Sequence, residues 1–206
     1  MPGVATVPRS PEPRPPLAAT LRDGTPVRMR AIRPEDRALL TTGMEHLSLG
    51  SRYRRFLSPI ARLSEQQLRD FTELDHVNHY AWVMMVQSGS EPVWIGVGRY
   101  VRDGDDAGLA EVAITVVDAW QGRGAGTLLV AATALVALDN GIERFHAEVL
   151  AENLPMLSVF RRLGGAVTSR QGYLVWVELA LRGCLPRLRS ALDGARTHAA
   201  SSAPSP

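Results

Sequence analysis

The order of apolar and polar residues along the chain predicts a series of β-strands. Residues 26–30, Pro-Val-Arg-Met-Arg, alternate between the two kinds, as a strand with one buried face does. Short apolar runs bounded by turn residues predict further strands at 81–86, 93–100, 109–117, 145–150 and 173–181. Ser88-Gly89-Ser90 and the run Asp-Gly-Asp-Asp at 103–106 supply turns between these strands.

Apolar residues at helical spacing predict helices in two parts of the chain. Arg33-Pro34-Glu35-Asp36 begins the first helix, with proline and acids in its first turn. Its apolar stripe is formed by Leu39, Leu40, Met44 and Leu47. A short helix follows over 48–56, and a capping box at Ser64 begins a third. Two more helices, 124–138 and 154–163, alternate with strands and indicate one α/β domain.

Composition narrows this picture to a folded domain with two tails. The Pro-rich residues 1–18 and the Ala/Ser/Pro-rich residues 191–206 are expected to be disordered, which leaves a domain over 19–190. A formal net charge of +2 argues against a nucleic-acid partner. No signal peptide is visible, and the most apolar run, 128–138, continues an amphipathic pattern and is too short to cross a membrane.

The cysteine content agrees with a reducing compartment. Cys184 is the single cysteine, so the chain cannot form an internal disulfide. It has no histidine nearby in sequence, which argues against a Cys–His nucleophile. We therefore expect a cytoplasmic protein without a membrane partner, and its oligomeric state is left open.

A glycine-rich turn between a predicted strand and a predicted helix carries the most specific chemistry. It reads Gln121-Gly-Arg-Gly-Ala-Gly-Thr127. Glycines allow a ligand close to the backbone, and the free N–H groups of the helix start suit a phosphate or pyrophosphate. A P-loop is excluded because no lysine follows Gly126, and the even glycine spacing does not fit the dinucleotide fingerprint. Tight packing alone is the alternative explanation for these glycines.

Two motifs together resemble the GNAT N-acetyltransferase superfamily. The first is Gln-x-x-Gly-x-Gly at Gln121, Gly124 and Gly126, which is similar to the acyl-CoA pyrophosphate loop of that family. The second is Asn153 followed by a helix that ends Phe160-Arg-Arg-Leu-Gly-Gly165. The resemblance covers about residues 26–181. It implies a mixed α/β fold, with a central, mostly antiparallel sheet flanked by helices, and acetyl-CoA as co-substrate.

Further segments resemble the bacterial protein-lysine acetyltransferases within this superfamily. These segments are Arg33-Pro34-Glu35-Asp36, Leu47-Ser48, Arg52-Tyr53-Arg54-Arg55-Phe56, Leu74-Asp75-His76 and Ala110-Glu111-Val112-Ala113. The resemblance implies transfer of acetyl groups to protein lysines. In that group the domain is often fused to a cyclic-nucleotide-binding or CoA-ligase-like domain. The chain has no room for either, so we expect no regulation through a fused domain.

The resemblance also implies a role for individual residues. Glu111 matches the catalytic glutamate, which takes the proton that an ammonium group must lose before it can attack. Its apolar surroundings favour a desolvated base, whereas the alternative is a strand-end carboxylate paired with an arginine. Backbone N–H groups at Val116 or Val117 would stabilise the oxyanion. The donor would bind to Gln121, Gly122, Arg123, Gly124, Ala125, Gly126, Thr127 and Asn153, the last of which also suits a helix N-cap.

Some roles stay open. Phe160 stands where many family members have a tyrosine that protonates the thiolate, and Tyr173 or Ser158 could replace it. His76 and His79 would share a helix face, but no third ligand is apparent, so no metal is expected. Arg52, Arg54 and Arg55 could meet the CoA 3′-phosphate, an acidic protein surface or only solvent.

Two other functions remain as alternatives to acetylation of protein lysines. A small-molecule amine acetyltransferase would need a deep, closed acceptor pocket rather than an open groove. A non-catalytic acyl-CoA-binding module would bind CoA without needing Glu111.

Overall fold

The computed structural model describes residues 14–88 and 91–201, so the expected turn at Ser88-Gly89-Ser90 lies largely outside the described residues. An eight-stranded sheet crosses the centre of the domain in the order β1-β2-β3-β4-β5-β6-β8-β7. The strands are β1 (Leu17–Thr20), β2 (Pro26–Ala31), β3 (His79–Ser88), β4 (Glu91–Arg102), β5 (Leu109–Val116), β6 (Arg144–Leu150), β7 (Ala166–Gln171) and β8 (Leu174–Ala180). Neighbours are antiparallel, except for the parallel pair β5 and β6.

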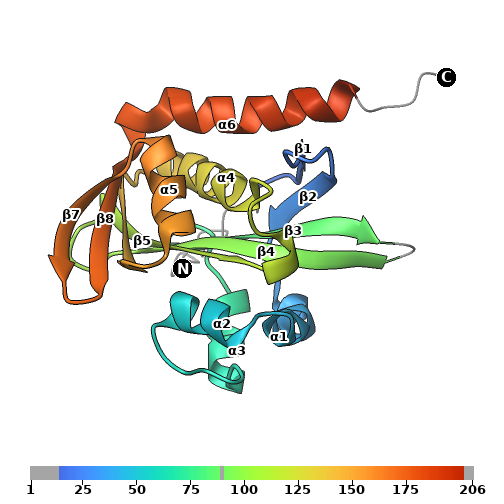
Figure 1. The fold of residues 1–206 in the computed structure, drawn as a ribbon, viewed down its shortest axis with the longest axis horizontal. Helices are drawn as coiled ribbons and strands as arrows, with labels where there is room; N and C mark the ends of the chain where they lie inside the picture. The colour runs from blue at the N-terminus through green and yellow to red at the C-terminus, as the bar shows by residue number, and fades with distance from the viewer. Residues whose placement is uncertain (1–13, 89–90, 202–206) are drawn as a thin grey trace, which may run out of the picture.

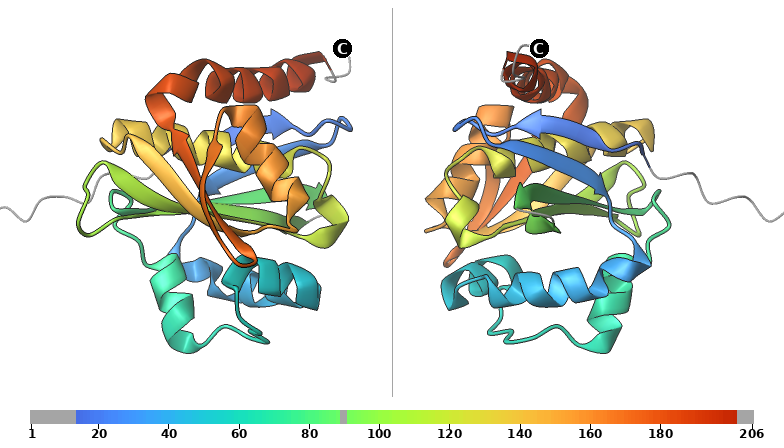
Figure 2. Two further views of the ribbon diagram at one scale, coloured as in Figure 1. Left: turned by 60° about the vertical axis from the view of Figure 1, so that its left-hand side comes forward. Right: turned by 90° about the vertical axis from the view of Figure 1, so that its right-hand side faces the viewer.

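Helices cover both faces of the sheet (Figures 1 and 2). One face is covered by α4 and α5, with α6 packed outside α4, and the other face is covered by α1, α2 and α3. The helices are α1 (Arg37–Glu45), α2 (Leu49–Phe56), α3 (Glu65–Thr72), α4 (Ala125–Asp139), α5 (Leu154–Leu163) and α6 (Leu181–Ser201), with short 3₁₀ helices η1 (Pro34–Asp36) and η2 (Asp118–Trp120). The predicted fold class, a mostly antiparallel sheet flanked by helices, is confirmed. No helix in the described segments is long and apolar enough to cross a membrane.

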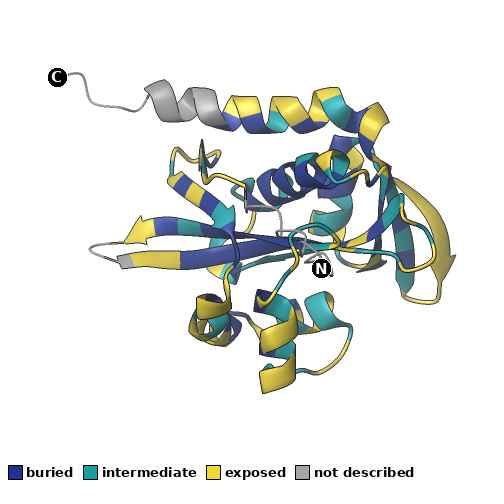
Figure 3. Ribbon diagram, turned by 180° about the vertical axis from the view of Figure 1, so that it is seen from behind, coloured by how far each residue is buried: buried dark blue, intermediate teal, exposed yellow. Residues whose placement is uncertain are grey.

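Helix α4 fills the space between the sheet and α6. Ten of its fifteen residues are buried, and most of the helix is dark blue in Figure 3, so the expected amphipathic pattern is wrong. A helix that is apolar on every side needs cover on every side. The sheet comes unusually close, because a Cβ atom on Gly98 would lie 3.0 Å from the Leu129 Cβ atom.

Three elements were not predicted from the sequence: β1, β7 and α6. Helix α6 runs through residues for which we expected a disordered tail from residue 191. Leu192 and Ala195 are buried in the core, so the beginning of that segment is part of the folded domain. The expected tail at residues 1–18 likewise overlaps β1, while residues 1–13 lie outside the described part.

Candidate active site

Strands β5 and β6 are paired at one end and separate at the other. Their register joins Leu109 to Arg144, Ala110 to Phe145 and Glu111 to His146, and it ends there. Strand β5 nevertheless continues to Val116 on the β4 side. Within residues 14–88 and 91–201, the backbone edge of β5 beyond Glu111 therefore has no strand partner on the β6 side, and it borders an opening in the sheet. A polar ligand arm can hydrogen-bond to such an edge.

The glycine-rich turn lies beside this opening. Gly122 and Gly124 have φ angles of 76° and 97°, a left-handed conformation that side chains with a Cβ atom adopt only with strain. Gly124 is the N-cap of α4, and no side chain caps the helix. The first N–H groups of α4 have no partner within the helix and, together with the helix dipole, form a site for an anion.

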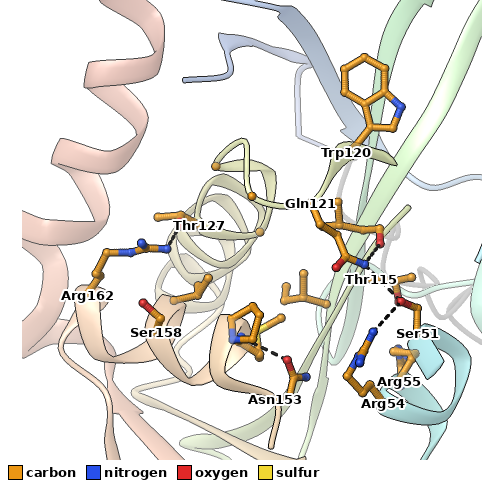
Figure 4. Close-up of a pocket in the computed structure, with 18 of the residues that line it drawn as sticks. Ser51, Arg54, Arg55, Thr115, Trp120, Gln121, Thr127, Asn153, Ser158 and Arg162 are labelled. Carbon is orange, nitrogen blue, oxygen red and sulfur yellow. Dashed lines mark hydrogen bonds between the residues drawn. The ribbon is translucent and has the colours of Figure 1, made fainter. Parts of the chain in front are cut away.

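A cavity of about 260 Å³ joins this turn to the opening. Seven of the predicted binding residues line it: Val116, Gln121, Gly122, Gly124, Gly126, Thr127 and Asn153. Figure 4 shows that it lies between α5, which carries Asn153, Ser158 and Arg162, and α2, which carries Ser51, Arg54 and Arg55. We call it the donor cavity. Val117, Arg123 and Ala125 do not line it.

The two candidate oxyanion donors differ in the direction of their N–H groups. The Val117 N–H donates to the Ile95 carbonyl oxygen at 3.0 Å, so it is directed to β4 and is already used. Successive residues of a strand direct their N–H groups to opposite edges. The Val116 N–H therefore faces the opening toward β6, and Val116 also lines the donor cavity. Of the two alternatives, this geometry favours Val116.

A second cavity, of about 280 Å³, lies on the other side of the opening and contains Glu111. We call it the acceptor cavity. It shares five lining residues with the donor cavity: Arg54, Arg55, Ile114, Asn153 and Met156. Glu111 is exposed, so the expected desolvation by its apolar strand is not found. His146 and Glu148 lie on the same face of the sheet, and Glu111 acts electrostatically on Arg55, whose pKa burial lowers and Glu111 raises.

Asp118 organises the wall between α2 and the glycine-rich turn, a role that the sequence analysis did not predict. Its carboxylate accepts hydrogen bonds from the Ser48 N–H at 2.7 Å, from the Ser51 hydroxyl at 2.5 Å and from the Gln121 amide at 3.2 Å. Partial burial raises the pKa of Asp118, but the hydrogen bonds from Ser48 and Ser51 and the charge of Arg54 outweigh it and hold the pKa below its ordinary value. The Gln121 amide also donates to the Val116 carbonyl at 3.0 Å. Gln121 thus links the turn to the end of β5.

Residues near the reaction centre have distinct placements. The Asn153 side chain caps α5 by accepting the Met156 N–H at 3.3 Å, as expected, and it lines both cavities. Phe160 is buried and lines the acceptor cavity. Of the two residues considered as replacements for a tyrosine, Ser158 lines the donor cavity. Tyr173 is 66% exposed and lines neither cavity.

The three arginines of α2 make different contacts. The Arg52 guanidinium donates to the carbonyl oxygens of Leu47 at 3.0 Å and Ala61 at 2.9 Å, so it holds the chain around α2. Arg54 and Arg55 line both cavities and lie where the two meet. That position suits contact with the reacting groups.

His76 and His79 do not share a helix face. Their segment is a turn in which Asp75 accepts the N–H groups of Val77, Asn78 and His79, and His79 begins β3. Among the described residues no group of three or more His, Cys, Asp or Glu could hold a metal ion. The His79 ring instead lies 3.3 Å from the buried Arg99 guanidinium.

This histidine makes stability depend on pH. Burial and the Arg99 charge lower the pKa of His79 to about 4. In the unfolded chain the pKa is near its ordinary value of about 6.5, so the unfolded state binds the proton first as the pH falls. We expect the free energy of unfolding to decrease between about pH 6.5 and pH 4, by up to about 1.4 kcal/mol per pH unit. Urea titrations of wild type and His79→Gln across this range measure the effect, and equal slopes for both would contradict it.

An anion site at a helix start and a cavity on either side of an opening in the sheet suit an enzyme that transfers a group from a phosphate-bearing donor to an acceptor. Residues 27–166 match the family described as an acetyltransferase (GNAT) domain. This chain therefore belongs to the GNAT acetyltransferase family.

Individual relatives agree with this assignment. The chain is 36% identical over 149 residues to Acetyltransferase Pat of Mycolicibacterium smegmatis. The matched residues make up 72% of this chain but only 44% of that protein, so this chain spans less than half of that relative's length. The crystal structure of the GNAT domain of S. lividans PAT superposes with a TM-score of 0.74 at 35% identity, covering 80% of this chain and 96% of that one. The protein yncA from Salmonella typhimurium, solved with acetyl-CoA, has a TM-score of 0.62 at 18% identity and covers 75% of this chain and 94% of that one. At that identity it shows the fold alone.

Proposed function

We propose that this acetyltransferase moves the acetyl group of acetyl-CoA to lysine side chains of proteins, with Glu111 as the general base. The observation that carries the proposal is the meeting of two cavities at the gap between β5 and β6. One cavity has the anion site at its far end, and the other has Glu111. A thioester that enters from the first cavity and an amine that enters from the second would meet beside the free edge of β5.

Different residues of the chain act at different steps of the reaction. The start of α4 holds the pyrophosphate, and the free edge of β5 binds the pantetheine arm. The acceptor nitrogen attacks the carbonyl carbon while Glu111, directly or through a water, takes its proton. The Val116 N–H stabilises the oxyanion until the carbon–sulfur bond breaks and the CoA thiolate leaves. Ser158 lines the same cavity and can supply the proton to the thiolate.

The acceptor cavity contains groups that can bind an amine. Two carboxylates in its lining, Glu111 and Glu148, can accept hydrogen bonds from an ammonium group, whereas the two arginines of the lining, Arg54 and Arg55, lie where the cavity meets the donor cavity. The segments 33–36, 47–48, 52–56, 74–76 and 110–113, which resemble protein-lysine acetyltransferases, favour a protein lysine over a small amine.

Mass spectrometry of acceptor peptides tests this proposal. We expect acetyl-lysine to form in a peptide library with one lysine in each peptide, and no product when that lysine is replaced by arginine. All 23 residues in the Lys+Arg count of this chain are arginines, so any acetyl-lysine must come from the acceptor. CoA release with small amines such as spermidine, and none with the peptides, would instead indicate a small-molecule acetyltransferase.

A further inference from the structure

A groove of about 640 Å³ continues from the donor cavity along the underside of α6. It shares Arg22, Gly124, Thr127 and Arg162 with the donor cavity, so the two form one continuous depression. The acceptor cavity does not share these residues. A ligand whose pyrophosphate lies at the start of α4 can therefore extend toward Glu111 at one end and into this groove at the other.

The groove is strongly basic, although the chain as a whole is close to neutral. Its lining contains Arg22, Arg123, Arg162 and Arg187 and no aspartate or glutamate. Arg123 pairs with Asp23 at 3.0 Å, just outside the lining. In the described part of the chain, the other three arginines form no ion pair. Three guanidinium groups without a carboxylate counter-charge favour a ligand that carries phosphate.

Two of these arginines come from different helices and lie near the end of α5. Arg162 is in the last turn of α5, and its guanidinium lies 3.4 Å from the Thr127 hydroxyl, as Figure 4 shows. Arg187 comes from α6 and lies against Gly164, where a Cβ atom would be only 2.5 Å from its Nη1. Gly164 ends α5 with a φ angle of 101°.

The side of α6 that faces the groove is otherwise made of small residues. Ser190, Ala191 and Gly194 line it and follow Arg187 at spacings of three, four and seven residues, which places them on one face of the helix. Small side chains on this face leave room for a flat ring system beneath the helix.

We propose that this groove binds the adenosine end of the donor and that Arg162 and Arg187 recognise its 3′-phosphate. The inference rests on the proposed use of acetyl-CoA as donor. Arg54 and Arg55, which we had considered for this phosphate, lie at the opposite end of the donor cavity (Figure 4). Helix α6 is then a specificity element, because it supplies one of the two phosphate ligands and the roof over the nucleoside.

Calorimetric binding of acetyl-CoA and 3′-dephospho-acetyl-CoA, without any acceptor, tests this inference. We expect the wild-type chain to bind the phosphorylated donor about tenfold or more tightly. Arg162→Gln and Arg187→Gln should each weaken acetyl-CoA binding about three- to tenfold and leave the binding of the dephosphorylated donor unchanged. Adenosine 3′,5′-bisphosphate should compete with acetyl-CoA for the wild type and less well for either variant.

Arg189→Gln is the matched control, because Arg189 is an exposed arginine of α6 that does not line the groove. It should bind both donors like the wild type, and Arg187→Lys should retain part of the preference. Equal affinity of the wild type for the two donors, or an equal loss for both in Arg187→Gln, would overturn the inference and leave the proposed function standing. Failure to bind either donor would overturn both.

Discussion

Replacing Glu111 by glutamine should lower kcat by about 10²- to 10⁴-fold, the usual contribution of a positioned general base. Glutamine keeps the shape of the side chain but cannot take a proton. The residue is the last of β5 that pairs with β6, and it faces the acceptor cavity at the point where the sheet opens. Binding of acetyl-CoA should be unchanged, because Glu111 does not line the donor cavity.

Steady-state CoA release with a lysine peptide measures this effect, and Glu148→Gln is the matched control. Glu148 lines the same cavity, so its replacement should raise the KM of the acceptor and have a much smaller effect on kcat. The deficit of Glu111→Gln should shrink as the pH rises, because more of the acceptor amine is then already deprotonated. A Glu148→Gln variant with the larger loss of kcat would transfer the role of base to Glu148.

Replacing Gly43 by alanine should lower the free energy of unfolding by about 1–3 kcal/mol, the usual cost of overpacking a core. In an exposed helix the same change is favourable by about 1 kcal/mol. Gly43 lies in α1 against the buried ring of Trp94, and a Cβ atom there would be 2.3 Å from the ring atom Cζ3. The alanine Cβ atom and the buried indole cannot both keep these positions, so the steric cost outweighs the gain in helix propensity and the variant is expected to be less stable.

Gly194→Ala provides the opposite expectation within the same protein. Gly194 lies in α6, and apart from the backbone of that helix no atom of the described residues lies within 4 Å of a Cβ atom at that position. Alanine there should raise the free energy of unfolding by about 0.5–1 kcal/mol. Urea denaturation of the two variants and the wild type measures both effects. A Gly43→Ala variant as stable as the wild type would show that Trp94 can move at little cost.

Local sequence patterns predicted most of the fold but not α6. The turns, caps and apolar periods between residues 26 and 163 are short-range signals, and the helices and strands lie where those signals indicate, except for the helix face expected at His76 and His79. Helix α6 contains Gly183, Pro186 and Gly194, which weaken a helical signal, and it is stabilised by burial of Leu188 and Leu192 against the domain. One feature of the sequence pointed indirectly to α6. Helix α4 is apolar on the side away from the sheet as well, which requires another element to cover it.

Only the part of the candidate site that depends on short-range sequence signals could be predicted. The glycine-rich turn is local, so its residues could be named from the sequence. The choice between Val116 and Val117 depends on which N–H faces β4, and that becomes clear only when the strands are paired. The exposure of Glu111 and the role of Asp118 likewise depend on elements that are distant in sequence.

Arginine is the only cation among the residues that line the groove under α6. A lysine in the same place would be the kind of residue that this enzyme is proposed to acetylate, so another copy of the enzyme could modify it, and acetylation would remove its charge. A guanidinium group stays protonated at physiological pH and is not acylated in this way. The groove that we infer for the adenosine end therefore offers no amine for acetylation, and its charge is the same after many turnovers as after the first.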